Sequence, residues 1–457
     1  MSSAGTPHLG RIFALTVVLG AGALVRLPFV AFDFHASADM DILRTWTTSL
    51  RSQPMDTIYD DPSVNYPPVP LYLFRVGDAV VLSLSRAHQA MGEAPAVVVK
   101  LPGMLADLST GALLAWMFRR QASPWPVLAC ALYVFNPAVW YVSAYWGQVD
   151  SVYVLFLAAA LAAISEGAPL PAWGLFVLAL ASKPQSSVLA PLIPLLTLLR
   201  HGTRAALRGG GVAIAVAAAV TLPWLLAGRL SDPLGAYFRL TAASRVDVSS
   251  YNLWYLLLGG HVHNLSSLNR PVGLPLTYQQ IGMVLFGTFA VAVMALVWRQ
   301  RGRTLFVPAA LLSLGFFLFA TEIHERYLLP ALAFLLMGAA RGEGNPPGRS
   351  PGRPLAAQGL GPWNLELVLA YMVVTGTLMY NLVTIAPFTR ALGSNLVYEL
   401  SVDSGLRVRA MNAAALLAGV FNVLVASWLA WTILPRPVQD RPGGKEPGTG
   451  SGGRSRS

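Results

Sequence analysis

Apolar runs of about 17 to 25 residues recur along the whole chain, and each is long enough to cross a lipid bilayer as a helix. Of the 457 residues, 55% are hydrophobic and 12% are charged, whereas about 25% of residues are charged in soluble proteins. This pattern predicts an all-α polytopic membrane protein. The single cysteine, Cys130, lies inside an apolar run, so the sequence offers neither a disulfide framework nor a cysteine-based metal site.

The distribution of arginines orients these runs across the membrane. The net charge of +11 is also typical of nucleic-acid binding, but positive residues concentrate in short loops on one side of membrane proteins, and we expect no nucleic-acid partner. With the N-terminus in the cytoplasm, the loops around Arg119, Arg200, Arg299 and Arg341 lie inside and most acidic residues lie outside. We therefore predict about twelve spans. They cover residues 11–32, 96–118, 125–143, 148–165, 171–182, 184–199, 209–228, 278–298, 304–320, 327–340, 363–386 and 408–434.

One further segment, Tyr66 to Arg86, is nearly apolar enough to count as a span. Arg75 and Asp78 lie in its middle, where each would cost about 2.5–3.5 kcal/mol at the bilayer centre. We therefore predict an amphipathic helix that lies along the outer surface.

Two long outer loops, at about 33–95 and 229–277, then complete a single transmembrane domain over residues 1–434. The segment 435–457 is rich in Gly, Pro, Ser and Arg, and this composition predicts a disordered cytoplasmic tail.

Several clusters of polar residues fall at the outer ends of the predicted spans. Asp39 and Asp41 follow the first span; a carboxylate beside an apolar surface can act as a base near neutral pH, but two solvated loop acids would give the same pattern. Gln148 and Asp150 occupy a turn that faces either water or a polar cavity. The Tyr66–Pro68 segment is interpreted as structural, because proline fixes an extended approach to the surface helix.

Lys183 and Gln185 interrupt an apolar stretch on either side of Pro184. Lys183 either extends its ammonium group to the membrane interface or directs it at a phosphate. A helix that begins near Pro184 would also offer backbone N–H groups to an anion.

His324, Glu325 and Arg326 stand between two apolar runs. Arg326 has planar donors that match a phosphate, and His324 can donate to a phosphate or transfer a proton. A local ion pair between Glu325 and Arg326 at the end of a span is the alternative. The zinc-binding His-Glu-x-x-His pattern is absent and no dense ligand cluster is evident, so we expect neither a metal nor another cofactor.

No P-loop, Rossmann fingerprint or nucleophile elbow appears in a strand–helix context. The polar groups lie instead at the outer ends of the predicted spans, next to the membrane. This location indicates a substrate that carries both a phosphate and a lipid tail.

These motifs resemble those of the GT-C glycosyltransferases, which use polyprenyl-phosphate sugars as donors. The resemblance is greatest to the dolichyl-phosphate-glucose-dependent glucosyltransferases and their bacterial relatives, and it runs from about Asp39 to Leu336. That family has an acidic residue, regarded as the catalytic base, seven residues before a Trp, as Asp39 is before Trp46. The other matching positions are Arg44, a second acid at Asp41, Tyr66 to Pro68, Gln148, Asp150 and Ser151, Lys183 and Gln185, and His324 to Arg326.

The resemblance implies a GT-C helical bundle whose long outer loops carry amphipathic helices. It also implies inverting transfer, with Asp39 as the base and Asp41 as a second catalytic candidate. The residues implied in binding the substrate and its phosphate are Arg44, Gln148, Asp150, Lys183, Gln185, His324, Glu325 and Arg326.

One turn departs from the eukaryotic pattern, because Trp146 and Gly147 stand where those members have a His. The turn is similar to that of bacterial relatives. A hexose of the mannose or glucose class is expected, and an arabinosyl donor, which carries a pentose, is left open. The sequence thus predicts a monomeric hexosyltransferase in a bacterial plasma membrane, with membrane lipids around it. Its active site would face outside and act on an envelope or lipid-linked acceptor. A transporter or lipid flippase is the alternative, but such proteins usually show repeats and polar residues at mid-membrane. A non-catalytic scaffold would leave the polar motifs unexplained.

Overall fold

The computed structural model describes residues 6–31, 38–84, 94–121, 124–239, 250–257, 275–343, 364–385 and 405–433, and every structural statement below concerns these residues. They form helices and loops, without a β-strand. The helices are α1 (Thr6–Ala31), α2 (Ala38–Ser52), η1 (Met55–Asp60), α3 (Pro68–Leu84), α4 (Ala96–Met117), α5 (Trp125–Val134), α6 (Pro137–Trp140), η2 (Tyr141–Tyr145), α7 (Asp150–Ser165), α8 (Pro169–Leu180), η3 (Pro184–Leu189), α9 (Leu192–Val220), α10 (Leu222–Leu226), α11 (Ser231–Arg239), α12 (Leu253–Leu257), α13 (Tyr278–Arg299), α14 (Phe306–Phe319), η5 (Glu325–Leu328), α15 (Leu329–Arg341), α16 (Leu365–Ile385) and α19 (Gly405–Ile433).

Each of the twelve predicted spans overlaps a helix or two or three consecutive helical elements. Five helical segments are long and apolar enough to cross a membrane, namely most of α1, α4, α13 and α16 and the segment Pro184–Val220. The bent pair of α5 with α6 and η2 makes a sixth, and α7, α8, α14 and Ala415–Trp431 are shorter apolar helices. The prediction of an all-α, multi-span chain is confirmed.

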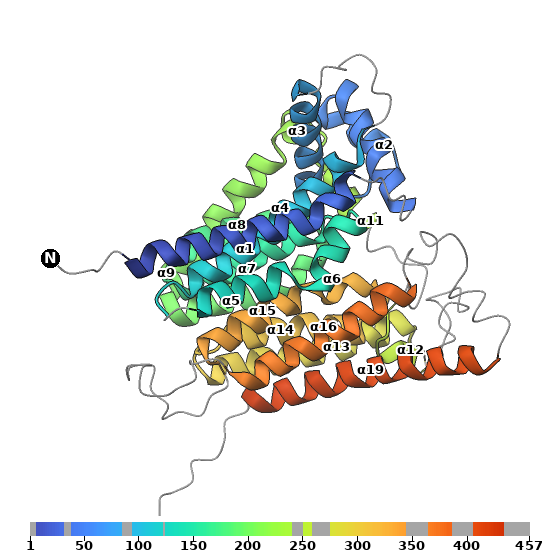
Figure 1. Ribbon diagram of the computed structural model, residues 1–457. Coiled ribbons are helices and arrows are strands. Elements are labelled where there is room, and N and C mark those ends of the chain that lie inside the picture. The colour runs from blue at the N-terminus through green and yellow to red at the C-terminus, as the bar shows by residue number, and fades with distance from the viewer. Residues whose placement is uncertain are drawn as a thin grey trace, which may run out of the picture.

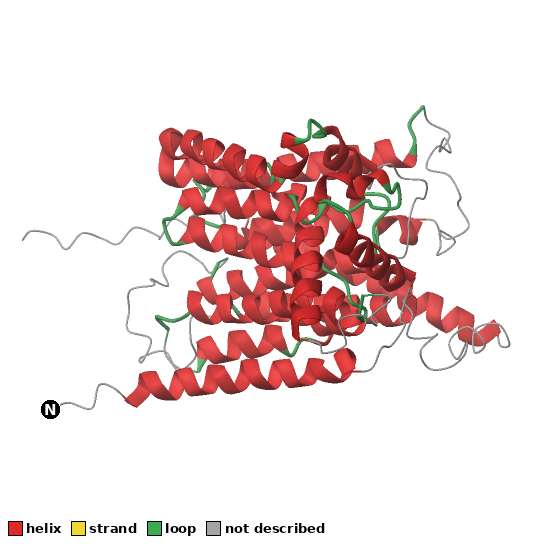
Figure 2. Ribbon diagram, turned by 90° about the horizontal axis from the view of Figure 1, so that it is seen from above, coloured by secondary structure: helices red, strands yellow, loops and turns green. Residues whose placement is uncertain are grey.

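The long helices lie side by side in one bundle, and α2 and α3 lie across one end of it (Figure 1). The same side-by-side arrangement is visible from the perpendicular direction (Figure 2). Large apolar side chains face outward from the bundle: Leu9 and Phe13 on α1, Ile214 on α9 and Val291 on α13 are exposed over 70% or more of their surface. Such an apolar outer surface suits contact with lipid chains. The backbone polar groups also tolerate this contact, because they are paired within the helices.

Helix α15 is the most enclosed part of the bundle. Every residue from Leu329 to Ala340 is buried, and α15 packs against α7, α14 and α16. The polar segment Glu325–Leu328 precedes it directly, so this segment is attached to the core.

Four predicted spans, 125–143, 184–199, 209–228 and 327–340, are divided between consecutive helical elements. The span 125–143 bends by 44° between α5 and α6, because Pro137 cannot donate to a continuing helix. The first backbone N–H groups of α6 are capped by Asn136, whose side chain accepts from the N–H of Ala138 at 2.9 Å. The span 184–199 begins as the 3-10 segment η3, and α9 starts only at Leu192.

Helix α9 is broken at Gly202, which has φ +82° and ψ 172°, a conformation open to glycine alone. Trp173 of α8 meets α9 on both sides of this break. Its indole donates to Thr197 at 3.2 Å, and it lies against Gly209. The two halves of α9 thus correspond to the separate spans 184–199 and 209–228.

The predicted surface helix at 66–86 is α3, at the end of the bundle (Figure 1). Its buried acid, Asp78, accepts two hydrogen bonds from Arg51 of α2, at 2.6 and 2.9 Å. Val76, Val80 and Leu84 are exposed on α3. The pair of Asp78 with Arg51 therefore fixes α2 on α3 and leaves apolar side chains facing outward.

Arginines gather at the opposite end of the bundle. Arg119 and Arg341 both bind Glu166, and Arg11 donates to the carbonyl of Arg119 at 2.7 Å. This grouping agrees with the predicted placement of the arginine loops on one side; which side faces the cytoplasm stays a prediction. The predicted tail at 435–457 lies outside the described residues.

A fully buried ion pair joins α1 to α4. Arg26 Nη2 lies 3.1 Å from Asp107 Oδ2, and both side chains have 0% exposure. Ser143 of η2 donates to the same carboxylate oxygen, so three elements meet at Asp107. Buried charges of this kind need their partners, because the interior does not solvate them.

We predict that Asp107→Asn destabilises the fold by about 3–5 kcal/mol, because Arg26 would stay buried without its counter-charge. The measurement is the thermal unfolding midpoint of the detergent-purified protein. The double variant Arg26→Met with Asp107→Leu should recover most of the loss, since removing both partners leaves no unpaired charge. An unchanged midpoint for Asp107→Asn would contradict this account.

Candidate active site

The turn before α7 is shaped by two local features. Residues Tyr141–Tyr145 form a π-helical turn, a feature that occurs frequently at functional sites. Gly147 then adopts φ +83°, and a Cβ at this position would lie 2.2 Å from the sulfur of Met40. The chain therefore needs glycine here, and the turn places Gln148 and Asp150 at the start of α7.

Asp39 lies in the first turn of α2 rather than in an open loop. The fully buried Gln148 donates from Nε2 to Asp39 Oδ2 at 2.8 Å. The Asp39 side chain is nonetheless 43% exposed. Asp39 is thus held by a fixed donor while part of its carboxylate is open to a substrate.

Lys183 and Asp150 form a buried ion pair, with Nζ 2.7 Å from Oδ2. Lys183 has the extended backbone, φ −155° and ψ 140°, that is typical of a residue before proline. Asp150 has 0% exposure and stands in the first turn of α7, where the helix dipole favours a negative charge.

Arg326 is the cation that connects the site. Its guanidinium lies 3.1 Å from Glu325 Oε1, 3.5 Å from Asp150 Oδ2 and 3.9 Å from Asp39 Oδ2. The same group lies 3.5 Å from Nδ1 of His324 and 4.9 Å from the ring centre of Trp146. Arg326 is almost fully buried, so the surrounding acids and ring determine its position.

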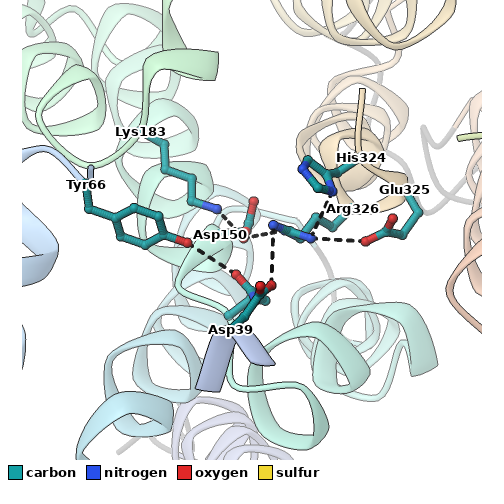
Figure 3. Close-up of polar contacts among 8 residues, drawn as sticks. Asp39, Tyr66, Asp150, Lys183, His324, Glu325 and Arg326 are labelled. Atoms are coloured by element: carbon teal, nitrogen blue, oxygen red, sulfur yellow. Dashed lines mark hydrogen bonds and ion pairs between the residues drawn. The ribbon is translucent and has the colours of Figure 1, made fainter. Parts of the chain in front are cut away.

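The structure thus brings together side chains from α2, α7, η5 and the loops that precede α7, η3 and η5, most of which are far apart in the sequence (Figure 3). The predicted site residues that meet here are Asp39, Gln148, Asp150, Lys183, His324, Glu325 and Arg326.

Three predicted site residues are placed differently. Arg44 donates from Nε to the carbonyl of Ala94 at 2.8 Å, which ties α2 to the residues before α4. Asp41 is exposed on α2. Gln185 borders a small cavity with Tyr153 and Tyr327, and its Oε1 has no hydrogen-bond partner among the described residues.

Two further residues, one at the site and one beside the Gly147 turn, were not predicted as site residues from the sequence. The Tyr66 hydroxyl lies 3.4 Å from Gln148 Oε1, and its ring centre lies 5.2 Å from Lys183 Nζ. Lys100 of α4 is fully buried and donates to the carbonyl of Phe29 at 2.8 Å. Lys100 is a charge inside a predicted span, and that signal indicates a functional or paired residue.

The site contains more acids than permanent cations, and the His324 imidazole lies beside Arg326. The three carboxylates of Asp39, Asp150 and Glu325 face the two cations of Lys183 and Arg326. Burial raises the pKa of Glu325 to about 7, although the neighbouring Arg326 opposes this shift. Glu325 therefore takes up a proton more readily than a solvated glutamate does.

The geometry defines a class of protein: a helical membrane protein with a buried cluster of charged side chains at one end of its bundle. The chain matches the model of glycosyltransferase family 87 over residues 66–321, more than half of its length, and belongs to this family. The family is of the GT-C type and uses polyprenyl-phosphate sugars. The protein is therefore an integral membrane glycosyltransferase with a polyprenyl-linked sugar donor. No curated protein matches the chain.

The GT-C resemblance predicted from the motifs is confirmed at the level of this family. The matched segment contains Gln148, Asp150 and Lys183 but ends before Arg326 and begins after Asp39. The roles of individual site residues stay predictions. Among the residues that the structure describes, no group of three or more His, Cys, Asp or Glu side chains is arranged to hold a metal ion.

We predict that Gly147→Ala abolishes most transferase activity, because the new methyl group would displace Met40 or the turn that carries Gln148. The matched control is Gly228→Ala. Gly228 also has a positive φ, +69°, but its Cβ position is open, so this variant carries only the backbone strain of about 1–2 kcal/mol. Turnover should fall much further in Gly147→Ala than in Gly228→Ala. Equal losses in the two variants would show that the close contact with Met40 is unimportant.

Proposed function

We propose that this glycosyltransferase transfers a hexose from a polyprenyl-phosphate sugar to an envelope or lipid-linked acceptor at the outer face of the membrane. The transfer inverts the anomeric configuration. The observation that supports this proposal most strongly is the contact of an accessible carboxylate, Asp39, with the buried guanidinium of Arg326 at 3.9 Å. A base and a phosphate-binding cation then lie side by side, as the reaction requires.

Asp39 acts as the base in this proposal. The acceptor hydroxyl gives its proton to the Asp39 carboxylate while its oxygen attacks the anomeric carbon. Gln148 holds one carboxylate oxygen at 2.8 Å, which limits the rotation of Asp39 and orients it for the transfer.

The bond from the anomeric carbon to the phosphate oxygen breaks in the same step, and the lipid phosphate leaves with the electron pair. Arg326 and Lys183, with His324 beside them, stabilise the negative charge that develops on this oxygen. The planar donors of Arg326 suit a phosphate. Glu325, at 3.1 Å from Arg326, orients the guanidinium.

The proposed outer location rests on the arginines around Glu166, which lie at the opposite end of the bundle from Asp39. Positive residues mark the cytoplasmic side of membrane proteins. A bacterial plasma membrane, a monomeric state and independence of metal belong to the same proposal. Membership of a glycosyltransferase family disfavours the transporter and flippase alternative.

We predict that Asp39→Asn lowers turnover by about 10²–10⁴-fold, because the amide cannot accept the acceptor proton. The measurement is release of polyprenyl phosphate from a polyprenyl-phosphate hexose by the purified protein, with binding of the donor checked separately. Asp41→Asn, which removes an exposed acid from the same helix turn, should cost far less. Full turnover by Asp39→Asn would show that the base is another residue.

We also predict that donor affinity falls by about threefold to tenfold between pH 6 and pH 8. The donor phosphodiester keeps one negative charge over this range, whereas Glu325, with its pKa raised to about 7, gains a negative charge next to Arg326. Glu325→Gln should flatten the dependence.

Imidazole groups titrate in the same pH range. The proteins with Glu and with Gln at position 325 are therefore compared in a His324→Gln background, which removes the imidazole. The measurement is equilibrium binding of the donor at each pH. If the slope is the same with Glu and with Gln at position 325, the proposed protonation of Glu325 is wrong.

A further inference from the structure

A second concave site lies at the arginine-rich end of the bundle, opposite the active site. It is a groove of about 430 Å³ formed by the ends of α4, α7 and α15 and the first half of α9. The side chains that line it include those of Arg120, Glu166, Arg200, His201 and Arg341. Four of these five are basic, so the groove favours an anion.

The two carboxylates near the groove, those of Glu166 and Glu343, already have binding partners within the protein. Glu166 binds Arg119 and Arg341, one with each carboxylate oxygen. The carboxylate of Glu343 accepts from the backbone N–H groups of Leu305, Phe306 and Val307 at 2.8 to 3.0 Å.

Arg120 and Arg200 are therefore not paired directly with these acids, although the Glu343 carboxylate lies near enough to attract Arg200. Within the described ranges, neither arginine forms an ion pair with a carboxylate, and Arg200 donates to a neutral carbonyl, that of Gly302, at 3.1 Å. Arg120 is exposed, so its guanidinium is accessible to a ligand.

The position of the groove also suits a phosphate. Its arginines follow or end apolar helices, which places them near the depth of lipid headgroups, and basic pockets between helices at this depth bind anionic headgroups. Arginine is the side chain best matched to a phosphate, because its donors are planar and fixed. The space is large enough for a phosphate with its glycerol or another small substituent.

We propose that this groove binds a phosphate-bearing anion, held by Arg120 and Arg200 and separate from the donor site. The anion comes either from the headgroup of an anionic phospholipid or from a soluble phosphate. Such a ligand would join α4 to α9 and stabilise the end of the bundle that faces away from the active site.

The test measures the thermal unfolding midpoint of the detergent-purified full chain at constant ionic strength. Short-chain phosphatidylglycerol, short-chain phosphatidylcholine and inorganic phosphate are titrated separately. The proposal predicts a saturable rise with phosphatidylglycerol, with inorganic phosphate, or with both, and a smaller rise with the zwitterionic lipid. A response to phosphatidylglycerol alone identifies a lipid headgroup, and an equal response to inorganic phosphate identifies a soluble anion.

The variant Arg120→Gln with Arg200→Gln should weaken the apparent affinity by about tenfold or more, because charged hydrogen bonds to the anion are lost. The matched control is Arg204→Gln with Arg299→Gln, which removes two exposed arginines that do not line the groove. Since Arg200 also contacts Gly302, Arg120→Gln alone is measured as well and should weaken binding without lowering the unliganded midpoint. The proposal is overturned if neither anion gives a saturable shift in the natural protein, or if the control pair weakens binding as much as the groove pair.

Discussion

The site depends on one buried cation, the guanidinium of Arg326, which is within 4 Å of Asp39, Asp150 and Glu325. In a medium that solvates ions poorly, a buried charge persists only when it is paired and hydrogen-bonded. The acids come from α2, α7 and η5, so Arg326 is the electrostatic link between three distant parts of the chain. Of the three acids, Asp39 alone has a partly exposed side chain, whereas Asp150 and Glu325 are buried. A phosphate that binds Arg326 would therefore lie next to the carboxylate that we propose as the base.

The charged residues of the site lie where helices end or are broken. Pro184 keeps Lys183 extended, the positive φ of Gly147 turns the chain into α7, and η5 precedes the most enclosed helix. Such irregular backbone is common at functional sites, where the surrounding structure holds it in place. Charged groups at helix ends are less costly than charged groups at the bilayer centre, because they can reach the membrane surface.

The sequence alone was sufficient for much of this architecture. Apolar runs and arginine loops predicted the spans, because both patterns follow directly from the physics of the bilayer. The polar residues between the runs also include most of the side chains that meet in the candidate site, since ionisable groups in an apolar chain are usually paired or functional. The pairing of Lys183 with Asp150 and the contact of Arg326 with Asp39 were not predictable, because they depend on how helices pack across long sequence separations. Arg44 matched the family motif but donates to the backbone of Ala94, a local detail that a motif cannot show.

Several charged residues that lie inside the predicted spans were not used in the predictions from the sequence. Arg26 and Asp107 lie within predicted spans, and together they form the ion pair between α1 and α4. Lys100 likewise begins a span but is bonded to the carbonyl of Phe29. Opposite charges in different apolar runs are candidates for contact, although sequence alone does not say which charges pair.

The most direct test of the central claim is a structure with a non-hydrolysable polyprenyl-phosphonate sugar, determined by electron cryo-microscopy in a lipid nanodisc. The account predicts density for the phosphonate against Arg326 and Lys183, with the anomeric carbon facing Asp39. Density for the phosphonate at any other position, with Arg326 still enclosed by Asp39, Asp150 and Glu325, would contradict it.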